Sequence, residues 1–462
     1  MIPLTDLNFG VLEIIYLLIV FVIGFMSTYL ILPYLIKFMK KKGYIGYDIH
    51  KNARPAVAES GGLSMVLGVS LASIVLMFFF PIIMNEIIIF ILTVISAGII
   101  GFIDDRLRLR SRYKIILTLF AGSIIFIANF FHFIQIKSPT IPFLGSLRIS
   151  ILYPFAIPLI VTVFANTVNM LEGYNGEGSG TCLIATCFLL VCGIIWNSAE
   201  AVIFAVPVIA VIIPFFMYNK FPAKIFPGDV GTLSMGAMIA CIMLFGSLEA
   251  AAFCTLLIHV FNSFYVITSV RGFFESSEIH NAEKDDIILL EDDRIKASDK
   301  KRAALTLPRL ILAKGPLTEP ELTKNFFAIS IICGFFSIII TLLMLLTNGA
   351  ISTPIVIVAI IFVSLSLIPP TVFLLYKFPR IRGTIALMSI LVVLGCFFLI
   401  FIDIYIMPIP LADLNLIVVK IPVNILLSFL FIAPALLVWY YVSIKYFFYE
   451  IAKMKQKSNI TS

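Results

Sequence analysis

Long apolar segments recur along almost the whole chain and limit the possible folds more than any other feature. A helix needs about 20 mostly apolar residues to cross a bilayer. The chain is 61% hydrophobic and 13% charged, whereas soluble domains carry roughly 25% charged residues. We therefore expect an all-α, polytopic transmembrane helix bundle of about 13 spans, a count that the closely joined pairs within 61–103 and 181–217 leave open by one or two. The expected spans are 14–36, 61–83, 86–103, 115–135, 150–168, 181–197, 199–217, 230–246, 249–270, 325–347, 352–376, 383–403 and 422–446.

The cationic residues are confined to alternate connections between these spans. The connections after the odd-numbered spans, with the tail after the last one, hold all but three of the 33 lysines and arginines. The exceptions are Lys137, Arg148 and Lys420. The positive-inside rule therefore predicts that these connections and the C-terminus face the cytoplasm, with the N-terminus outside. The first apolar segment follows no basic region and is too long for a signal-peptide core, so we expect it to be a retained span.

All seven cysteines lie inside apolar segments. None of them forms a CxxC pair or a Cys/His spacing typical of a metal site. We interpret them as small buried hydrophobic residues.

One long polar segment, residues 271–324, mixes acidic and basic side chains. Its early part is typical of a short solvated helix or a hairpin, and we expect most of its charges to be a wetted surface. Three connections on the other side of the membrane, at 84–86, 197–200 and 348–352, are very short. The residues with chemical variety therefore gather on the predicted cytoplasmic side.

Two adjacent carboxylates close the third apolar segment, in the motif GFIDDRLRLRSRYK at residues 101–114. Ionised groups are costly near hydrocarbon, so Asp104 and Asp105 predict a functional site. Acidic residues contribute little to topology, and anchoring alone does not explain the pair. The arginines that follow alternate with leucine and serine, and we interpret them as topology signals and lipid-headgroup contacts. Lys114 begins the next apolar segment and can reach back toward the acids.

The connection at residues 45–62 carries a second set of polar residues. Lys51 and Glu59 are its candidates for function. The spacing alone leaves function evenly balanced against a simple stop-transfer cluster. The pair Gly61-Gly62 permits a tight entry into the next span.

A third motif, ANTVNMLEGYNGEGSG, occupies residues 165–180. Asn166 and Asn169 are three residues apart and share one helical face. The four glycines that follow form a turn that can expose backbone N–H groups to an anion or a nucleotide. A glycine-rich turn that only connects two helices remains the alternative.

A fourth motif, NKFPAKIFPGDVGTLSMG, occupies residues 219–236. Its Pro-Gly turn places Asp229 in the first turn of the next helix, where an acid can be an N-cap, a metal ligand or both. Phe226 can stack on a planar base or pack in the core. Mg²⁺ is usually held by one or two carboxylates together with substrate phosphates, and Asp229 with Asn169 or the acid pair supplies such ligands. The residues alone thus predict a cytoplasm-facing, metal-assisted phosphate site.

Together these four motifs resemble those of the polyprenyl-phosphate N-acetylhexosamine-1-phosphate transferases. The resemblance covers residues 30–320, and its motifs follow one another in loops on one side of the membrane. The Ala-Glu-Ser before Gly61, the single Asn in GYNG and the Leu-Pro-Arg ending at Arg309 are most similar to the eukaryotic and archaeal branch. That branch transfers N-acetylglucosamine-1-phosphate from UDP-N-acetylglucosamine to dolichyl phosphate.

The resemblance implies a role for each matching residue. Asp229 and Asn169 would hold Mg²⁺, or Mn²⁺ in its place, on the sugar-nucleotide pyrophosphate. Asp104 and Asp105 would act at the lipid phosphate and Lys114 at a phosphate. Asn175 and Phe226 would contact the uracil, and Arg309 would contact the pyrophosphate or the sugar phosphate. The full substrate-binding set is Lys51, Glu59, Asn166, Gly173, Asn175, Phe226 and Arg309, with uracil at Asn175 and Phe226.

Three features depart from the family pattern. Glu172 and Asn175 stand where bacterial relatives carry aspartates, and the bacterial His-rich motif is missing. Eukaryotic relatives carry a basic run just before the Pro-Arg pair, and this chain has Ala-Leu-Thr-Leu at 304–307 instead. The identity of the sugar is therefore the least determined inference. Lys301 and Arg302 are candidates to take the place of the basic run. About three further spans follow the ten-span family core. We therefore divide the chain into a transferase core at 1–347, which includes 271–324, and additional helices with a tail at 348–462.

The implied activity is the transfer of N-acetylhexosamine-1-phosphate from a UDP-sugar to a polyprenyl or dolichyl phosphate, with release of UMP. The expected partners are these two substrates and the lipid bilayer, with no nucleic acid; a homodimer is left open. The membrane would be the plasma membrane in a prokaryote or archaeon and the endoplasmic reticulum in a eukaryote. A transporter or lipid flippase is the competing class, but it predicts broken or charged helices near mid-bilayer and matching half-repeats, which the sequence does not show.

Overall fold

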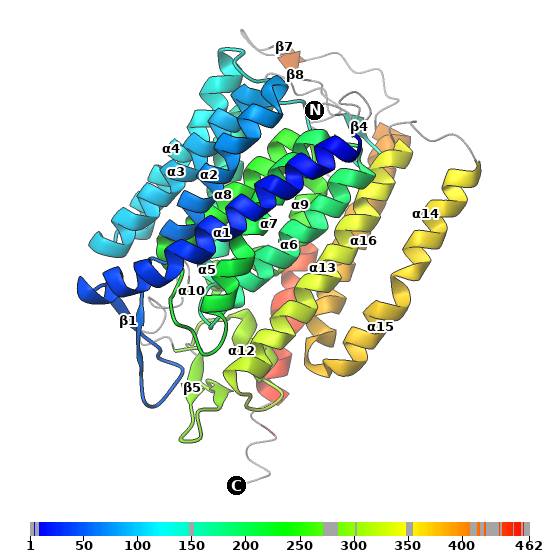
Figure 1. The fold of residues 1–462 in the computed structure, drawn as a ribbon. Coiled ribbons are helices and arrows are strands. Elements are labelled where there is room, and N and C mark those ends of the chain that lie inside the picture. Colours follow the sequence, from blue (N-terminus) through cyan, green and yellow to red (C-terminus); the bar gives the residue numbers. More distant parts are fainter. Residues whose placement is uncertain are drawn as a thin grey trace.

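The protein is a bundle of long, apolar helices (Figure 1). This computed structural model describes residues 4, 9–146, 152–270, 285–300, 303–347, 354–406, 414–415, 420–421, 434, 437–446, 448–453 and 456. Within them, eleven helices are long and apolar enough to cross a membrane, or twelve if a bent pair counts as one span. The spanning helices of the core are α1 (Val11–Lys41), α2 (Gly62–Phe79), α3 (Met84–Leu107), α4 (Ser111–Phe130), α5 (Leu152–Leu171), α6 (Glu177–Ile195), α7 (Ala199–Asn219), α8 (Gly228–Gly246) and α13 (Glu319–Thr347).

Twelve of the thirteen predicted spans coincide with helices, and they confirm the all-α class. The span predicted at 249–270 is bent by 68° between α9 (Glu249–Thr255) and α10 (Leu257–Val270). The span predicted at 352–376 is divided into α14 (Pro354–Ser366) and α15 (Ile368–Lys377). Most of the thirteenth predicted span, 422–446, lies outside the described residues.

The helices α14 and α15, which follow α13 in the chain, lie at the edge of the bundle. Figure 1 shows α14 and α15 beyond α13 on one flank of the bundle, with α16 (Arg382–Phe401) next to α13. Many large apolar side chains of α14 and α15 are exposed, as expected for a surface that faces lipid. Five of the seven cysteines are buried, but Cys396 is only partly buried and Cys187 is exposed. The prediction of uniformly buried cysteines is therefore wrong for these two, because an apolar segment in a membrane also has a lipid-facing side.

Helix α8 forms the centre of the bundle and packs against α3 and α5. Small residues make these contacts close, as is common between membrane helices. A Cβ on Gly101 would lie 2.4 Å from the carbonyl oxygen of Asp229, and a Cβ on Gly236 would lie 2.5 Å from the Cα of Ala165. The close approach at Gly101 brings the acidic end of α3 to the first turn of α8.

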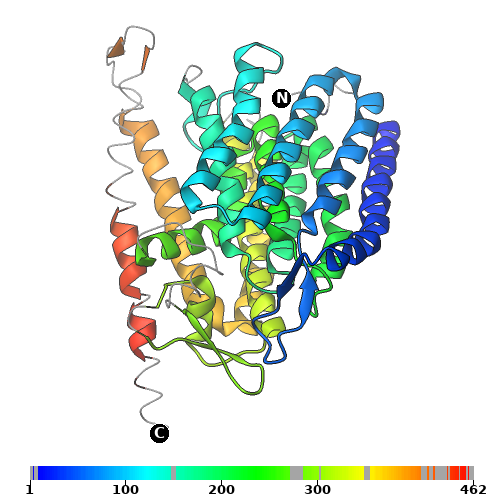
Figure 2. The same ribbon diagram turned by 90° about the vertical axis from the view of Figure 1, so that its left-hand side faces the viewer.

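Two short hairpins and a short helix lie together at one end of the bundle (Figures 1 and 2). They are β1 (Ile45–Tyr47) with β2 (Ala56–Ala58), β5 (Ile287–Leu289) with β6 (Ile295–Ala297), and α12 (Leu307–Leu312). Both hairpins are antiparallel, with Gly46 opposite Val57 and Ile288 opposite Lys296. A hairpin thus occurs in the long polar segment, although residues 271–284 lie outside the described part.

Among the described residues, the opposite end of the bundle carries two small strand pairs. These are the two-residue pairs β3 (Thr140–Ile141) with β4 (Gly145–Ser146) and β7 (Leu414–Asn415) with β8 (Lys420–Ile421). The loops that carry the predicted site motifs therefore meet at the other end.

Candidate active site

A cavity of about 490 Å³ opens among the loops at the end of the bundle that carries the hairpins. Its walls come from the β1–β2 hairpin, the α3–α4 connection, the glycine-rich turn after α5, the start of α8 and the segment before α12. Nine of the twelve predicted site residues line it. They are Glu59, Asp104, Asp105, Lys114, Asn169, Gly173, Asn175, Phe226 and Asp229.

A buried ammonium group joins the ends of three helices at this cavity. Lys114 of α4 forms ion pairs with Asp104 of α3 and with Asp229 of α8, the latter with 3.0 Å between Nζ and Oδ2. Lys114 and Asp104 are 3% and 2% exposed, so their charges are poorly screened by water. The prediction that Lys114 reaches back toward the acids at the end of α3 is confirmed for Asp104. Two carboxylates around one ammonium leave one negative charge, which favours a further cation at this wall.

Asp105 ties α3 to the beginning of α8. Its Oδ1 accepts the main-chain N–H of Asp229 at 2.7 Å, and its Oδ2 accepts the hydroxyl of Ser60 at 2.6 Å. Arg106 donates to the same hydroxyl oxygen at 2.6 Å, and its guanidinium lies 3.5 Å from the centroid of the Tyr44 ring. A carboxylate at a helix N-terminus satisfies a main-chain N–H that has no partner within the helix. Asp105, rather than Asp229 itself, is thus the acid that caps α8.

The side chains of Asn169 on α5 and Thr232 on α8 are hydrogen-bonded to each other at the wall of the cavity. The hydroxyl of Thr232 donates to Oδ1 of Asn169 at 2.7 Å, and Asp229 lies one helical turn before Thr232. Carboxylate and amide oxygens of this kind are hard ligands of the type that Mg²⁺ prefers. The residues present therefore fit a magnesium ion. Thr232 would orient the amide, because an outer hydrogen bond fixes the direction of a ligand.

Carboxyl oxygens of two glutamates accept hydrogen bonds from backbone N–H groups of the glycine-rich turn. Glu172 accepts the N–H of Gly178 at 2.7 Å, and Glu177 accepts those of Gly173 and Tyr174 at 3.1 and 3.2 Å. The prediction that these groups face an anion or a nucleotide is therefore wrong, because carboxyl oxygens of the two glutamates already accept their hydrogen bonds. Burial raises the pKa of Glu172 to about 8, with Glu319 raising it further and the bond from Gly178 opposing the rise.

The β1–β2 hairpin completes the opposite wall. The partly buried Glu59 lines the cavity there, and burial raises the pKa of its carboxyl while the charges of Arg106 and Arg108 oppose the rise. Asp48 and His50 of the same hairpin also line the cavity. Asp48 forms an ion pair with Lys51, with 2.5 Å between Oδ2 of Asp48 and Nζ of Lys51.

The sequence profile of glycosyl transferase family 4 matches residues 87–247, the stretch from α3 to α8 that supplies Asp104, Lys114, Asn169 and Asp229. A Methanocaldococcus jannaschii protein that is provisionally named a glycosyltransferase is 31% identical over 312 residues, covering 67% of this chain and 93% of the relative. The chain belongs to the polyprenyl-phosphate N-acetylhexosamine-1-phosphate transferase family. Its motifs and their convergence on one cavity agree with that membership.

Two further relatives of this transferase carry more specific names. A Sulfolobus acidocaldarius protein, provisionally named a UDP-N-acetylglucosamine–dolichyl-phosphate N-acetylglucosaminephosphotransferase, is 31% identical over 239 residues, or 50% of this chain and 72% of the relative. The phospho-N-acetylmuramoyl-pentapeptide-transferase of Streptococcus pyogenes is 31% identical over 242 residues, or 49% of this chain and 71% of the relative. The family thus includes members with different sugars.

Three predicted site residues of the transferase lie outside the cavity lining. Asn166 lies one helical turn from Asn169 along α5, and its amide donates to the Thr118 hydroxyl at 3.0 Å and to the Thr162 carbonyl at 2.8 Å. The i, i+3 spacing places Asn166 on the same helical face as Asn169, but one turn along the helix axis. At that depth Asn166 joins α5 to α4. Lys51 lies beside the cavity, bound to Asp48 and 4.4 Å from the centroid of the Phe221 ring.

Arg309 is the third, and its surroundings differ most from the prediction. The side chain is 2% exposed, and all five guanidinium N–H groups point to carbonyl oxygens. The acceptors are the carbonyls of Ser298, Lys300, Ala303 and Ala304, at 2.8 to 3.1 Å. No N–H of this guanidinium remains for a pyrophosphate, so Arg309 is placed to hold residues 298–300 and 303–304 in position.

Several cavity residues of the transferase were absent from the predicted set. Asp48, His50, Glu172, Tyr174, Asp286 and Thr306 line the cavity. Asp48 lies three residues before Lys51 in the connection at 45–62 and could have been found there. Asp286 accepts the Thr306 hydroxyl, and burial raises the pKa of its carboxyl while that hydrogen bond and the Arg309 charge oppose the rise. No sequence spacing indicates this contact across 20 residues.

Proposed function

We propose that this transferase moves N-acetylglucosamine-1-phosphate from UDP-N-acetylglucosamine to a polyprenyl phosphate of the dolichyl type, and releases UMP. The observation that carries the proposal is Lys114, buried between Asp104 and Asp229 at a cavity that Asn169 also lines. The name of the Sulfolobus relative supports this choice of sugar and lipid. The product, a lipid pyrophosphate sugar, would begin the assembly of a glycan such as that of N-glycosylation.

In the proposed reaction a phosphate oxygen of the lipid attacks the β-phosphorus of the sugar nucleotide. A new oxygen–phosphorus bond forms there, and the bond from that phosphorus to the oxygen bridging the two phosphates breaks. The bridging oxygen leaves with UMP. The lipid phosphate is already anionic near pH 7, so no protein nucleophile is needed.

Asp229 and Asn169 would hold a Mg²⁺ ion in this reaction, with Mn²⁺ as a substitute. The ion would neutralise charge on the pyrophosphate oxygens when bound. Lys114 would stabilise the charge that develops on the phosphates, and preorganised charge of this kind is usually the largest contribution to catalysis. Asp104 would keep the ammonium in place, and Asp105 would act through the main chain of Asp229.

The proposed orientation places the cavity on the cytoplasmic side. The loops that form it belong to the connections that carry nearly all lysines and arginines. Such connections remain in the cytoplasm according to the positive-inside rule. A UDP-sugar made in the cytoplasm would then reach the site directly.

The proposal is tested by measuring UMP release by the purified full-length protein with polyprenyl phosphate and Mg²⁺. UDP-N-acetylglucosamine, UDP-N-acetylgalactosamine and UDP-N-acetylmuramoyl-pentapeptide are supplied separately. We expect the first donor to give the highest kcat/KM. A preference for another donor would contradict the proposed sugar, and UMP release that does not depend on the lipid would contradict the proposed acceptor.

A further inference from the structure

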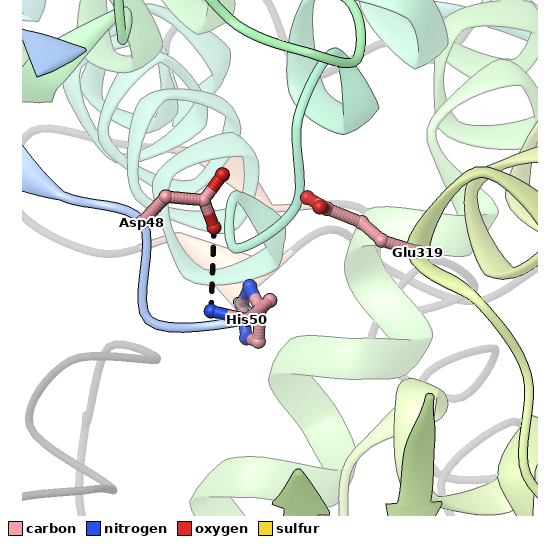
Figure 3. A group of neighbouring side chains, drawn as sticks. All are labelled: Asp48, His50 and Glu319. Atoms are coloured by element: carbon pink, nitrogen blue, oxygen red, sulfur yellow. Dashed lines mark hydrogen bonds between the residues drawn. The ribbon is translucent and has the colours of Figure 1, made fainter. Parts of the chain in front are cut away.

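Three side chains that can ligate a metal meet beside the cavity, and none of them takes part in the ion pairs of Lys114 with Asp104 and Asp229. They are Asp48 and His50 of the β1–β2 hairpin and Glu319, the first residue of α13. One ligand atom from each lies within 4.8 Å of the others. Figure 3 shows the Asp48 and Glu319 carboxylates pointing toward each other across a space that His50 borders.

The burial of this cluster is unusual for two acidic groups that face each other. Asp48, His50 and Glu319 are 3%, 8% and 3% exposed. Burying an ionised carboxylate is costly unless it is paired or coordinates a metal. The residues come from segments more than 260 positions apart, so their meeting results from the tertiary fold.

Neighbouring residues hold the three side chains in place. Asn175 donates its main-chain N–H to Oε1 of Glu319 at 2.7 Å and its side-chain amide to Oδ2 of Asp48 at 3.0 Å. The ring of Tyr174 stacks on His50, with 4.4 Å between centroids and 22° between planes. Outer contacts of this kind orient ligands in metal sites.

The charge of the cluster is only partly balanced by Lys51. Its ammonium lies 2.5 Å from Oδ2 of Asp48, so one positive charge faces two carboxylates. The same ammonium lies 4.4 Å from the centroid of the Phe221 ring, where a cation is also stabilised. Lys51 can therefore leave Asp48 without losing every favourable contact.

We propose that Asp48, His50 and Glu319 bind a divalent transition-metal ion, with Zn²⁺ as the best match, in exchange for the Lys51 ammonium. An imidazole with two carboxylates is a ligand set that suits Zn²⁺, whereas Mg²⁺ prefers oxygen ligands alone. Tetrahedral coordination would draw the ligand atoms to about 3.4 Å apart, with water as the fourth ligand. The ion would fasten the β1–β2 hairpin to α13, and the glycine-rich turn would be held to both through the hydrogen bonds of Asn175. This site is distinct from the one proposed at Asp229.

The test is Zn²⁺ binding to the full-length protein in detergent by titration calorimetry. Every variant is made in the Asp229→Asn background, so that the other proposed metal site does not contribute and the outcome is independent of transferase activity. We expect one Zn²⁺ per chain. His50→Ala should weaken binding at least tenfold, whereas Lys51→Met should strengthen it, because a competing cation is removed. His132→Ala is the matched control, since this histidine is exposed and far from the cluster in sequence.

X-ray absorption of the Zn²⁺-loaded protein gives a second readout. One imidazole nitrogen with oxygen ligands, and loss of that nitrogen in His50→Ala, is expected. Equal affinity in His50→Ala and the control would overturn the proposal, and so would sulfur ligands or weaker binding in Lys51→Met. Near-equal thermal stability of the apo variants would show that these outcomes do not reflect unfolding.

Discussion

The main-chain N–H of Asp229 donates a hydrogen bond of 2.7 Å to Oδ1 of Asp105. This bond joins the first turn of α8 to the last turn of α3, beside the close approach at Gly101. The position of Asp229 therefore depends on the side chain of Asp105, which accepts hydrogen bonds from the Asp229 N–H and from the Ser60 hydroxyl. The two acids that the sequence presents as a pair have separate structural positions, one against Lys114 and one against α8.

Replacing Asp105 should reduce turnover without abolishing donor binding. Asp105→Ala leaves the Asp229 N–H without its partner, and small misplacements of a reactive group can cost about 100-fold in rate. We expect about a 100-fold lower kcat with a donor KM within threefold of wild type. Asp105→Asn keeps a carbonyl acceptor and should retain about a tenth of the activity. Equal activity of the two variants would contradict this positioning role.

Removing the Lys114 charge should affect both stability and activity. Lys114→Met leaves two carboxylates without their cation, and breaking a buried ion pair from one side costs roughly 3–5 kcal/mol. Adding Asp104→Asn should recover much of the thermal stability, because one uncompensated charge is removed. Activity should stay at least about 1000-fold reduced in both variants, since the phosphate-facing ammonium is absent. Recovery of UMP release in the double variant would refute the catalytic role of Lys114.

Glu172 should make the folded state less stable as the pH rises. Its pKa is raised to about 8 in the folded protein from an ordinary value of 4.5, so the folded state holds the proton more tightly than the unfolded state. The resulting stabilisation is complete below pH 4.5 and is lost as the pH rises to about 8. Thermal unfolding in detergent, measured from pH 5 to 9, should show a falling Tm. Glu172→Gln keeps an acceptor for Gly178 and should flatten this dependence; an unchanged slope would contradict the assignment.

Arg309 should act by holding residues 298–300 and 303–304 in position. Lysine cannot make five hydrogen bonds of fixed geometry, so Arg309→Lys should increase the rate of limited proteolysis in 285–308 and lower the Tm. Arg380→Lys is a control for the loss of a guanidinium. Arg380 is partly buried and donates a hydrogen bond to the Gly315 carbonyl. A raised donor KM with unchanged proteolysis would instead indicate the direct phosphate contact implied by family resemblance.

Sequence patterns predicted the parts of this structure that depend on local order. Twelve spans followed from hydrophobic length, and the contact of Lys114 with the acids followed from the short connection between α3 and α4. The bend between α9 and α10 was not predicted, because length and composition are the same for a bent span and a straight one.

Contacts between distant segments could not be predicted from spacing. Asn175 and Glu319 are 144 residues apart, and only the packing of α13 beside α6 brings them together. The hydrogen bonds of Arg309 to carbonyl oxygens are equally invisible in the sequence, because a cation that binds a phosphate and one that binds backbone look alike there. In the glycine-rich turn, Glu172 before the first glycine and Glu177 between two glycines were the signal that the N–H groups had internal partners.

The central claim is that Asp229, placed beside Lys114 and Asn169, supports transfer of a sugar phosphate to a lipid phosphate. The most direct test is the initial rate of UMP release from UDP-N-acetylglucosamine by wild type and Asp229→Asn, with and without polyprenyl phosphate and with Mg²⁺ or EDTA. We predict release by wild type only when lipid and Mg²⁺ are both present, and a rate at least about 1000-fold lower in Asp229→Asn. Comparable rates in the two proteins, or full activity of wild type in EDTA, would contradict the account.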